Sequence, residues 1–129
     1  MAKTSGTISA ANSAVEGCRK PVLGMIAGFA LGAACALVAA CDLRVATPRA
    51  RFGITPAKLG LVYPLHDTKL LVDLIGPGRA KKMLFTGELQ TAEEAQSMGL
   101  VEQIAENADD VALAIAANSL HSTQEMKKV

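Results

Sequence analysis

The chain has 129 residues, which is the size of one ordinary domain and too short for two separate hydrophobic cores. Half of its residues are hydrophobic, 19% are charged and 3% are aromatic, which excludes a disordered chain, because disorder requires low hydrophobicity and high net charge. The net charge is +1 with no basic run, so the sequence carries no electrostatic footprint for binding nucleic acid.

Sulfur and imidazole groups are few and scattered. Cys18, Cys35 and Cys41 form no C-x-x-C pair and stand among small apolar residues, which is typical of buried thiols in a reducing compartment. His66 and His121 are far apart in the chain, so we expect no metal site. Residues 1–7 have no apolar signal core, so we expect a cytoplasmic protein.

The first half of the chain predicts alternating helices and strands. A helix over residues 8–19 ends at Lys20-Pro21, because the residue before a proline is pushed out of the helical region. The pattern then predicts a strand over 22–27, a turn over 28–32, an Ala-rich helix over 32–41, a strand over 42–46, a short extended piece over 50–52 and a loop with one helical turn over 53–64.

The second half is predicted to be mostly helical. Thr91 and Glu94 form a capping box that begins a helix ending at Gly99. Around it we expect helices over 67–75, 78–86 and 108–118, and a short strand over 100–104. The strand–helix–strand order implies a parallel α/β layer, although two or three strands are few for a complete sheet.

A membrane-spanning segment is the alternative for residues 21–41, which carry no charge and are long enough to cross a bilayer. Much of this stretch is Ala and Gly, and its character changes midway from strand-like to helix-like. These features favour a buried strand, turn and helix, with no membrane partner.

Five motifs in register resemble the enoyl-CoA hydratase/isomerase (crotonase) superfamily, from Lys20 toward the end of the chain. They are Lys20–Ala46, Arg51–Leu61, Gly76–Lys81, Leu84–Gly87 and Ala92–Val101. The resemblance implies an α/β fold of the crotonase type, a ββα spiral truncated at both ends, so that residues 1–129 form a partial crotonase-like domain. It also implies an acyl-CoA thioester as substrate, no further cofactor, and a homo-oligomer of the trimer type.

In this superfamily two backbone amides bind the thioester oxygen and stabilise the enolate. The resemblance assigns one of these amides to Ala33, at the start of the Ala-rich helix, and places Phe29, Leu31, Gly32 and Ala34 against the substrate. The alternative is a turn of small residues that only lets helix and strand pack closely.

The superfamily's hydratases also use two glutamates as acid and base. Their positions fall on Ala36 and on Pro56 or Thr55, none of which can carry a proton, so hydration by such a pair is not expected. Near them, His66 is a candidate base, with Asp67 as its orienting partner and Tyr63 as a hydrogen-bond donor. Alternatively, Asp67 is a helix N-cap and His66 a solvated turn residue.

Two functions follow from these residues. The first is an enoyl-CoA hydratase/isomerase family protein that acts on acyl-CoA thioesters through an enolate. The second is a catalytically silent crotonase-like domain that serves as an oligomerisation or folding module. Whether the chain is an enzyme therefore stays open.

Three cations lie close together in the helix predicted over 78–86. We interpret Arg79, Lys81 and Lys82 as a solvated helix face in preference to a phosphate clamp.

Overall fold

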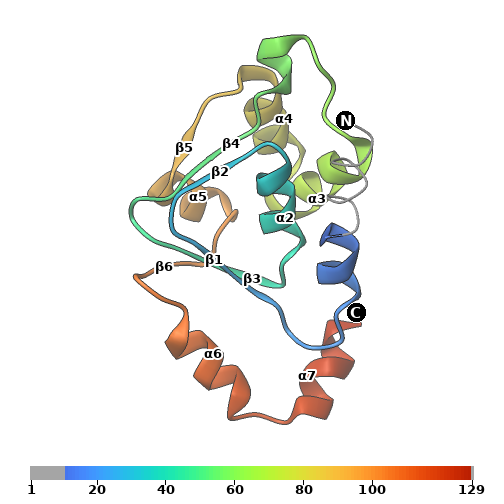
Figure 1. Cartoon of the computed structure of the whole chain (residues 1–129), viewed down its shortest axis with the longest axis vertical. Coiled ribbons are helices and arrows are strands. Elements are labelled where there is room, and N and C mark those ends of the chain that lie inside the picture. Colours follow the sequence, from blue (N-terminus) through green and yellow to red (C-terminus); the bar gives the residue numbers. More distant parts are fainter. Residues whose placement is uncertain (1–10, 129) are drawn as a thin grey trace.

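The computed structural model describes residues 11–128 (Figure 1), so the predicted helix over 8–19 is described only in part. Residues 11–17 are helical, and the helix ends before Lys20-Pro21 as expected. Residues 1–10 and Val129 lie outside the described part of the chain.

The strands form two small sheets. In the first, β1 (Leu23–Ile26), β3 (Leu43–Ala46) and β6 (Gln103–Ile104) lie in the order β1-β3-β6 and are all parallel. In the second, β2 (Phe29–Leu31) pairs in parallel with β4 (Arg51–Gly53), which pairs antiparallel with β5 (Gln90–Thr91). The first four strands thus alternate between the sheets, whereas β4 and β5 both belong to the second. The predicted parallel strand pairing is confirmed for β1-β3-β6 and β2-β4, while the β4-β5 pair is antiparallel.

The turn predicted over residues 28–32 is wrong, because Phe29–Leu31 form strand β2. The glycines on either side suggested a turn, but the segment is held by pairing with β4, more than twenty positions further along the chain. The count of two or three strands is wrong for the same reason, since the short strands β2, β4 and β5 depend on long-range partners.

Most predicted helices are confirmed. The structure places α2 at Ala33–Ala40, a 3₁₀ turn η1 at Pro56–Leu59, α4 at Pro77–Thr86 and α5 at Ala92–Met98 with its capping box. Helix α3 runs over Leu65–Ile75 and its N-cap is Pro64, so Asp67 lies in the first turn and is not the N-cap. The helix predicted over 108–118 is confirmed as α6 (Asp109–Ala116). A separate helix, α7 (Leu120–Lys127), follows it, because the Ser119 side chain accepts a hydrogen bond from Ser122 N and caps a new helix.

The core is made of small residues around a few large ones, as the Ala-rich composition requires. Phe52, Ile54, Leu71, Met83 and Leu100 are the largest fully buried apolar side chains. Helices α2, α3 and α4 pack on one another beside the β2-β4-β5 sheet, while α6 and α7 lie apart from them at the bottom of the view (Figure 1). Cys35 is buried as predicted, but Cys18 and Cys41 are only partly buried. Among the described helices none is long and apolar enough to cross a membrane.

Candidate functional site

The turn between β2 and α2 is built on Gly32, which has φ +57° and ψ −117°. A residue with a Cβ adopts this positive φ only with strain, so glycine is required here. The Gly32 N–H donates to the Gly53 carbonyl at 2.8 Å, which ties the turn to the end of β4. A Cβ placed on Gly32 would meet no atom within 4 Å, so this side of the turn is open.

Ala33 is the first residue of α2, so its N–H has no partner within the helix. The structure gives this N–H no backbone acceptor among residues 11–128. The helix dipole adds a partial positive charge at the same end. The Ala33 N–H is therefore a suitable donor for a small anion or a polarised carbonyl oxygen, which is the role that the family resemblance assigns to it.

Tyr63 lies against this turn from the segment that leads into α3. Its hydroxyl donates to the Gly32 carbonyl at 2.8 Å, and the residue is 9% exposed. Burial raises the pKa of Tyr63, and the nearby Cys35 and Asp67 raise it further, while the Ala36 N–H lowers it. The hydroxyl therefore stays protonated and acts as a donor at neutral pH.

Asp67 is buried at the start of α3, with 8% of the residue exposed. Asn12 Nδ2 donates to Asp67 Oδ1 at 3.4 Å, and Asn12 itself is 3% exposed. Burial raises the pKa of the Asp67 carboxyl, and His66 and the Asn12 hydrogen bond oppose that shift. The Asp67 carboxyl therefore holds a proton more tightly than a solvated aspartate does.

His66 points to a different partner. Its Nε2 lies 2.8 Å from Glu16 Oε1, and its side chain is 62% exposed. The structure therefore buries Tyr63, just before α3, and Asp67, in its first turn, and leaves the His66 ring on the surface. No hydrogen bond joins His66 to Asp67 among the described side chains, so they do not form the base and orienting pair that their adjacency suggested.

The other residues assigned to the substrate surround the same turn. Phe29 and Leu31 are 67% and 41% exposed, on the face of β2 opposite the buried Ala30. Ala34 is exposed in the first turn of α2. These residues offer accessible apolar surface beside the Ala33 N–H.

The two glutamate positions of the superfamily's hydratases carry no acid here. Ala36 is buried in α2, and Thr55 and Pro56 begin η1. Pro56 lines an apolar cavity of about 260 Å³ together with Tyr63 and Phe85. This cavity can hold an apolar group, but its lining has no carboxyl, imidazole or amino group, and its hydroxyl groups are those of Tyr63 and Thr68.

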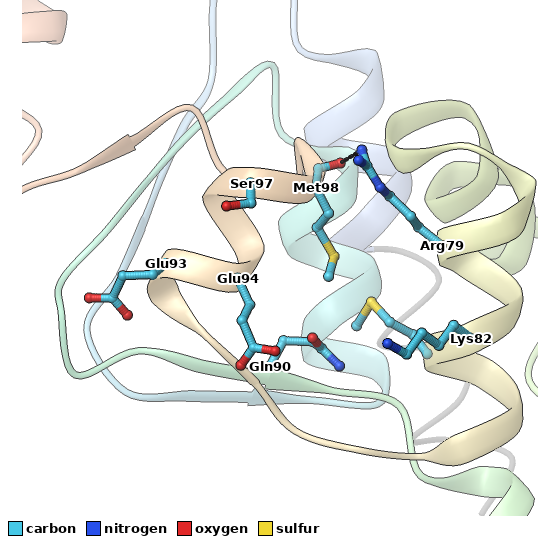
Figure 2. Close-up of a pocket in the computed structure, with 8 residues that line it drawn as sticks. Arg79, Lys82, Gln90, Glu93, Glu94, Ser97 and Met98 are labelled. Atoms are coloured by element: carbon cyan, nitrogen blue, oxygen red, sulfur yellow. Dashed lines mark hydrogen bonds between the residues drawn. The ribbon is translucent and has the colours of Figure 1, made fainter.

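A second cavity of about 350 Å³ lies between α4 and α5 (Figure 2). Arg79 and Lys82 line one side, and Glu93 and Glu94 line the other. Arg79 Nη1 donates to the Met98 carbonyl at 3.3 Å, which links the two helices. Because both signs of charge face this cavity, it is not adapted to a phosphate group, in agreement with the interpretation of these cations as a helix face.

Sequence reasoning missed several of these partners. Gly53, Asn12 and Glu16 contact the candidate residues from positions far away in the chain, and no local pattern pairs them. Within residues 11–128 the structure brings together no group of three His, Cys, Asp or Glu side chains that could hold a metal ion.

The fold and the turn at Gly32 define an α/β protein of the crotonase type, and known structures agree. An enoyl-CoA hydratase/isomerase family protein from Hyphomonas neptunium superimposes with a TM-score of 0.91 at 45% identity, over 98% of this chain and 51% of that chain. An enoyl-CoA hydratase from Bacillus anthracis gives a TM-score of 0.89 at 33% identity, over 98% and 52% of the two chains. The family model described as enoyl-CoA hydratase/isomerase matches residues 1–127, so the chain belongs to this family.

Curated relatives show the same relationship. A crotonyl-CoA hydratase of Syntrophomonas wolfei is 40% identical over 90 residues, which are 70% of this chain and 35% of that protein. A short-chain-enoyl-CoA hydratase of Clostridioides difficile is 40% identical over 88 residues, or 68% of this chain and 56% of the relative. The chain thus spans between a third and somewhat more than half of the length of these relatives.

Proposed function

We propose that the chain binds acyl-CoA thioesters and polarises the thioester carbonyl at the Ala33 N–H. The observation that carries this proposal is the open turn at Gly32, which leaves the first amide of α2 free of a backbone partner. Family membership supports the substrate class. Phe29, Leu31, Gly32 and Ala34 are the proposed contacts around the reacting carbonyl.

The chemistry that fits this site is stabilisation of an enolate. When a proton leaves the carbon next to the thioester, negative charge moves to the carbonyl oxygen, and a fixed N–H donor lowers the energy of that state. The helix dipole acts in the same direction. The resemblance assigns one of the family's two oxyanion amides to this chain, so the proposed site supplies one of the two donors.

For the proton transfer itself we propose the first turn of α3. Asp67 is the better placed group, because its carboxyl is buried near Tyr63 with a raised pKa. His66 is the neighbouring titratable group, at the surface with Glu16. Hydration by two glutamates is not proposed, since Ala36 and Pro56 or Thr55 cannot act as acid or base.

A silent crotonase-like module is the second candidate function. It is supported by the same absence of acids at Ala36 and Pro56, and by apolar side chains exposed just before α3, at its first residue and on α4. Val62, Leu65 and Phe85 are 93%, 85% and 73% exposed. Exposed apolar surface of this kind favours association, so we propose a homo-oligomer in either case.

The decisive experiment compares two ligands by calorimetry: a saturated acyl-CoA and the matching S-alkyl-CoA thioether, which lacks the carbonyl oxygen. We expect the thioester to bind more tightly, because only it can accept a hydrogen bond from Ala33. Ala33→Pro removes the N–H at a position where proline suits the helix, and Ala33→Gly keeps the N–H as the matched control.

Loss of the preference in the proline variant and its retention in the glycine variant support the proposal. Equal binding of both ligands to the unchanged chain contradicts it and favours the silent module. Light scattering on the same samples tests the oligomer, and a clean monomer at micromolar concentration contradicts that part.

A further inference from the structure

We infer that Tyr63 is a positioning residue for the Ala33 N–H, which it orients and strengthens through the peptide group that Gly32 and Ala33 share. This inference rests on the proposed function, because it concerns the same amide. It assigns to Tyr63 no contact with the substrate.

The geometry of one peptide group carries the inference. The Gly32 carbonyl and the Ala33 N–H belong to the same planar unit, so whatever fixes one fixes the other. The Gly32 oxygen accepts hydrogen bonds from Tyr63 Oη at 2.8 Å, from Cys35 N at 3.0 Å and from Ala36 N at 3.3 Å. Of these three hydrogen bonds, the one from Tyr63 is the shortest, and it is the only one donated by a side chain.

The neighbouring peptide is fixed as well, because the Gly32 N–H donates to the Gly53 carbonyl at 2.8 Å. The flexible glycine is thus held on both sides, once by a strand end and once by Tyr63. A glycine with φ +57° would otherwise have many conformations open to it. Tyr63 therefore reduces the conformational freedom of Gly32, whose backbone angles set the direction of the Ala33 N–H.

Polarisation is the second effect. Donation to a carbonyl oxygen draws electron density from the amide nitrogen and makes the N–H of the same unit a stronger donor, and such cooperative strengthening is about 10–30% per bond. A donor fixed in advance also needs no reorganisation when charge develops on the substrate oxygen. Both effects act on any oxygen that the Ala33 N–H contacts, and they grow as negative charge develops on that oxygen.

The environment of Tyr63 suits this role. The residue is buried, its hydroxyl is kept neutral, and it is followed directly by Pro64, the N-cap of α3. Helices α2 and α3 pack on each other, so the tyrosine joins the two elements at the candidate site. Tyr63 is also the only tyrosine in the chain, which makes it accessible to specific labelling.

Tyr63→Phe is the direct test, since it removes the hydroxyl and keeps the ring. Thr123→Val is the matched control, because Thr123 Oγ1 also donates to a backbone carbonyl, that of Leu120 at 3.0 Å, within α7. The first readout is the carbon-13 shift of the Gly32 carbonyl in the ligand-free protein. We expect it to move upfield in Tyr63→Phe and to stay unchanged in Thr123→Val.

The second readout is the infrared stretch of the thioester carbonyl in bound acyl-CoA. We expect it to return toward the frequency of the free ligand in Tyr63→Phe, and the thioester to bind more weakly by a factor of about 2 to 10, with the thioether unaffected. Replacing the tyrosine by 3-fluorotyrosine lowers the phenol pKa and makes it a better donor. This substitution, which perturbs packing little, should move both readouts in the opposite direction.

The outcomes separate the inference from the proposed function. An unchanged Gly32 carbonyl shift in folded Tyr63→Phe and in the fluorotyrosine protein overturns the inference whatever the ligand does. A changed shift with an unchanged thioester frequency also overturns it, since the amide is then not strengthened. If the unchanged protein does not distinguish thioester from thioether while the Gly32 shift still responds to Tyr63, the proposed function fails, and the catalytic meaning of the tyrosine fails with it.

Discussion

Arg44 and Glu102 form an ion pair between β3 and the residue that precedes β6, with 2.6 Å between Nη2 and Oε1. The Arg44 side chain is only 5% exposed, and that of Glu102 is 37% exposed. Arg44 Nη1 also donates to the Cys41 carbonyl at 2.6 Å, beyond the last turn of α2. One cation therefore stabilises the carboxyl end of the helix whose other end carries the candidate site.

The first prediction concerns this pair. Arg44→Met leaves the α2 carbonyls and Glu102 without their donor, so we expect the free energy of unfolding to fall by about 3 kcal/mol. Glu102→Gln keeps an oxygen that can accept the hydrogen bond from Arg44, so it should lower the free energy of unfolding by only about 1 kcal/mol. Urea denaturation followed by circular dichroism measures both.

The exposed pair Arg49–Glu106 gives the control, with side chains 64% and 66% exposed and 3.0 Å between Nη2 and Oε2. Arg49→Met should leave the denaturation midpoint essentially unchanged, because solvent screens such pairs. Equal effects of Arg44→Met and Arg49→Met would contradict the role given to Arg44.

Local signals in the sequence predicted much of the fold. The capping box at Thr91 and Glu94 is present, with 3.1 Å between Glu94 N and Thr91 Oγ1. The helix after Pro77 ends at Gly87, whose φ is +64°. These features depend on residues close in the chain, so pattern and chemistry are sufficient to find them.

Features held by distant residues could not be predicted in this way. Strand β2 exists because β4 pairs with it, and Gly53 at the end of β4 is closely packed, since a Cβ on it would lie 2.8 Å from Leu89 Cδ2 and that side chain would have to move. The side chains of His66 and Asp67 have different partners, since His66 contacts Glu16 and Asp67 accepts a hydrogen bond from Asn12. Neither contact has a periodic or spacing signal in the sequence.

The second prediction concerns Cys35, which is 1% exposed and whose thiol pKa is raised by burial to about 12. We expect this thiol to resist Ellman's reagent at pH 8 until the protein unfolds, because the thiolate is the reactive form. Cys18 and Cys41 are partly exposed and serve as internal references. Reaction of all three thiols at one rate in the folded protein would contradict the assignment.

The same thiol makes stability depend on alkaline pH. Below the ordinary pKa of 9.0 both states hold the proton, so the contribution of Cys35 is fully present. As the pH rises from 9.0 toward 12, only the unfolded thiol ionises, and stability falls by about 1.4 kcal/mol per pH unit. Cys35→Ala should remove this contribution to the slope and leave those of Cys41 and Tyr63, whose pKa values burial also raises. Denaturation at several alkaline pH values measures the difference.

The third prediction concerns the buried carboxyl of Asp67. Burial raises its pKa above the ordinary 3.8, so its stabilising contribution is present below that pH and is lost as the pH rises through the folded-state pKa. At neutral pH the ionised, buried carboxylate lowers the free energy of unfolding. Asp67→Asn should therefore be more stable than the original chain at pH 7, with a difference that narrows under acidic conditions.

A second effect acts in the same direction, because Asn12 Oδ1 is buried without a hydrogen-bond partner among the described residues. An asparagine at position 67 offers an N–H₂ donor to that oxygen. Asp73→Asn, on the exposed face of the same helix, is the control and should change little. A variant at position 67 that is less stable at both neutral and acidic pH would show that the carboxylate is stabilising.

The fourth prediction concerns turnover. General acid and base groups contribute about 10² to 10⁴-fold each, and one oxyanion donor about 10² to 10³-fold. Without acids at Ala36 and at Pro56 or Thr55, this chain should hydrate crotonyl-CoA at least about 10⁴-fold more slowly than a relative that has them. Side-by-side assays of hydration and double-bond isomerisation measure this directly.

Any remaining activity should be isomerisation or proton exchange next to the thioester, because a single acid–base group is enough for either. We expect Asp67→Asn to abolish it while the fold is retained. His66→Ala should have a smaller effect, since its ring lies at the surface with Glu16 2.8 Å away. Rapid hydration that neither substitution affects would show that the catalytic groups lie elsewhere or are supplied by another chain, because no described side chain at the hydratase positions can move a proton.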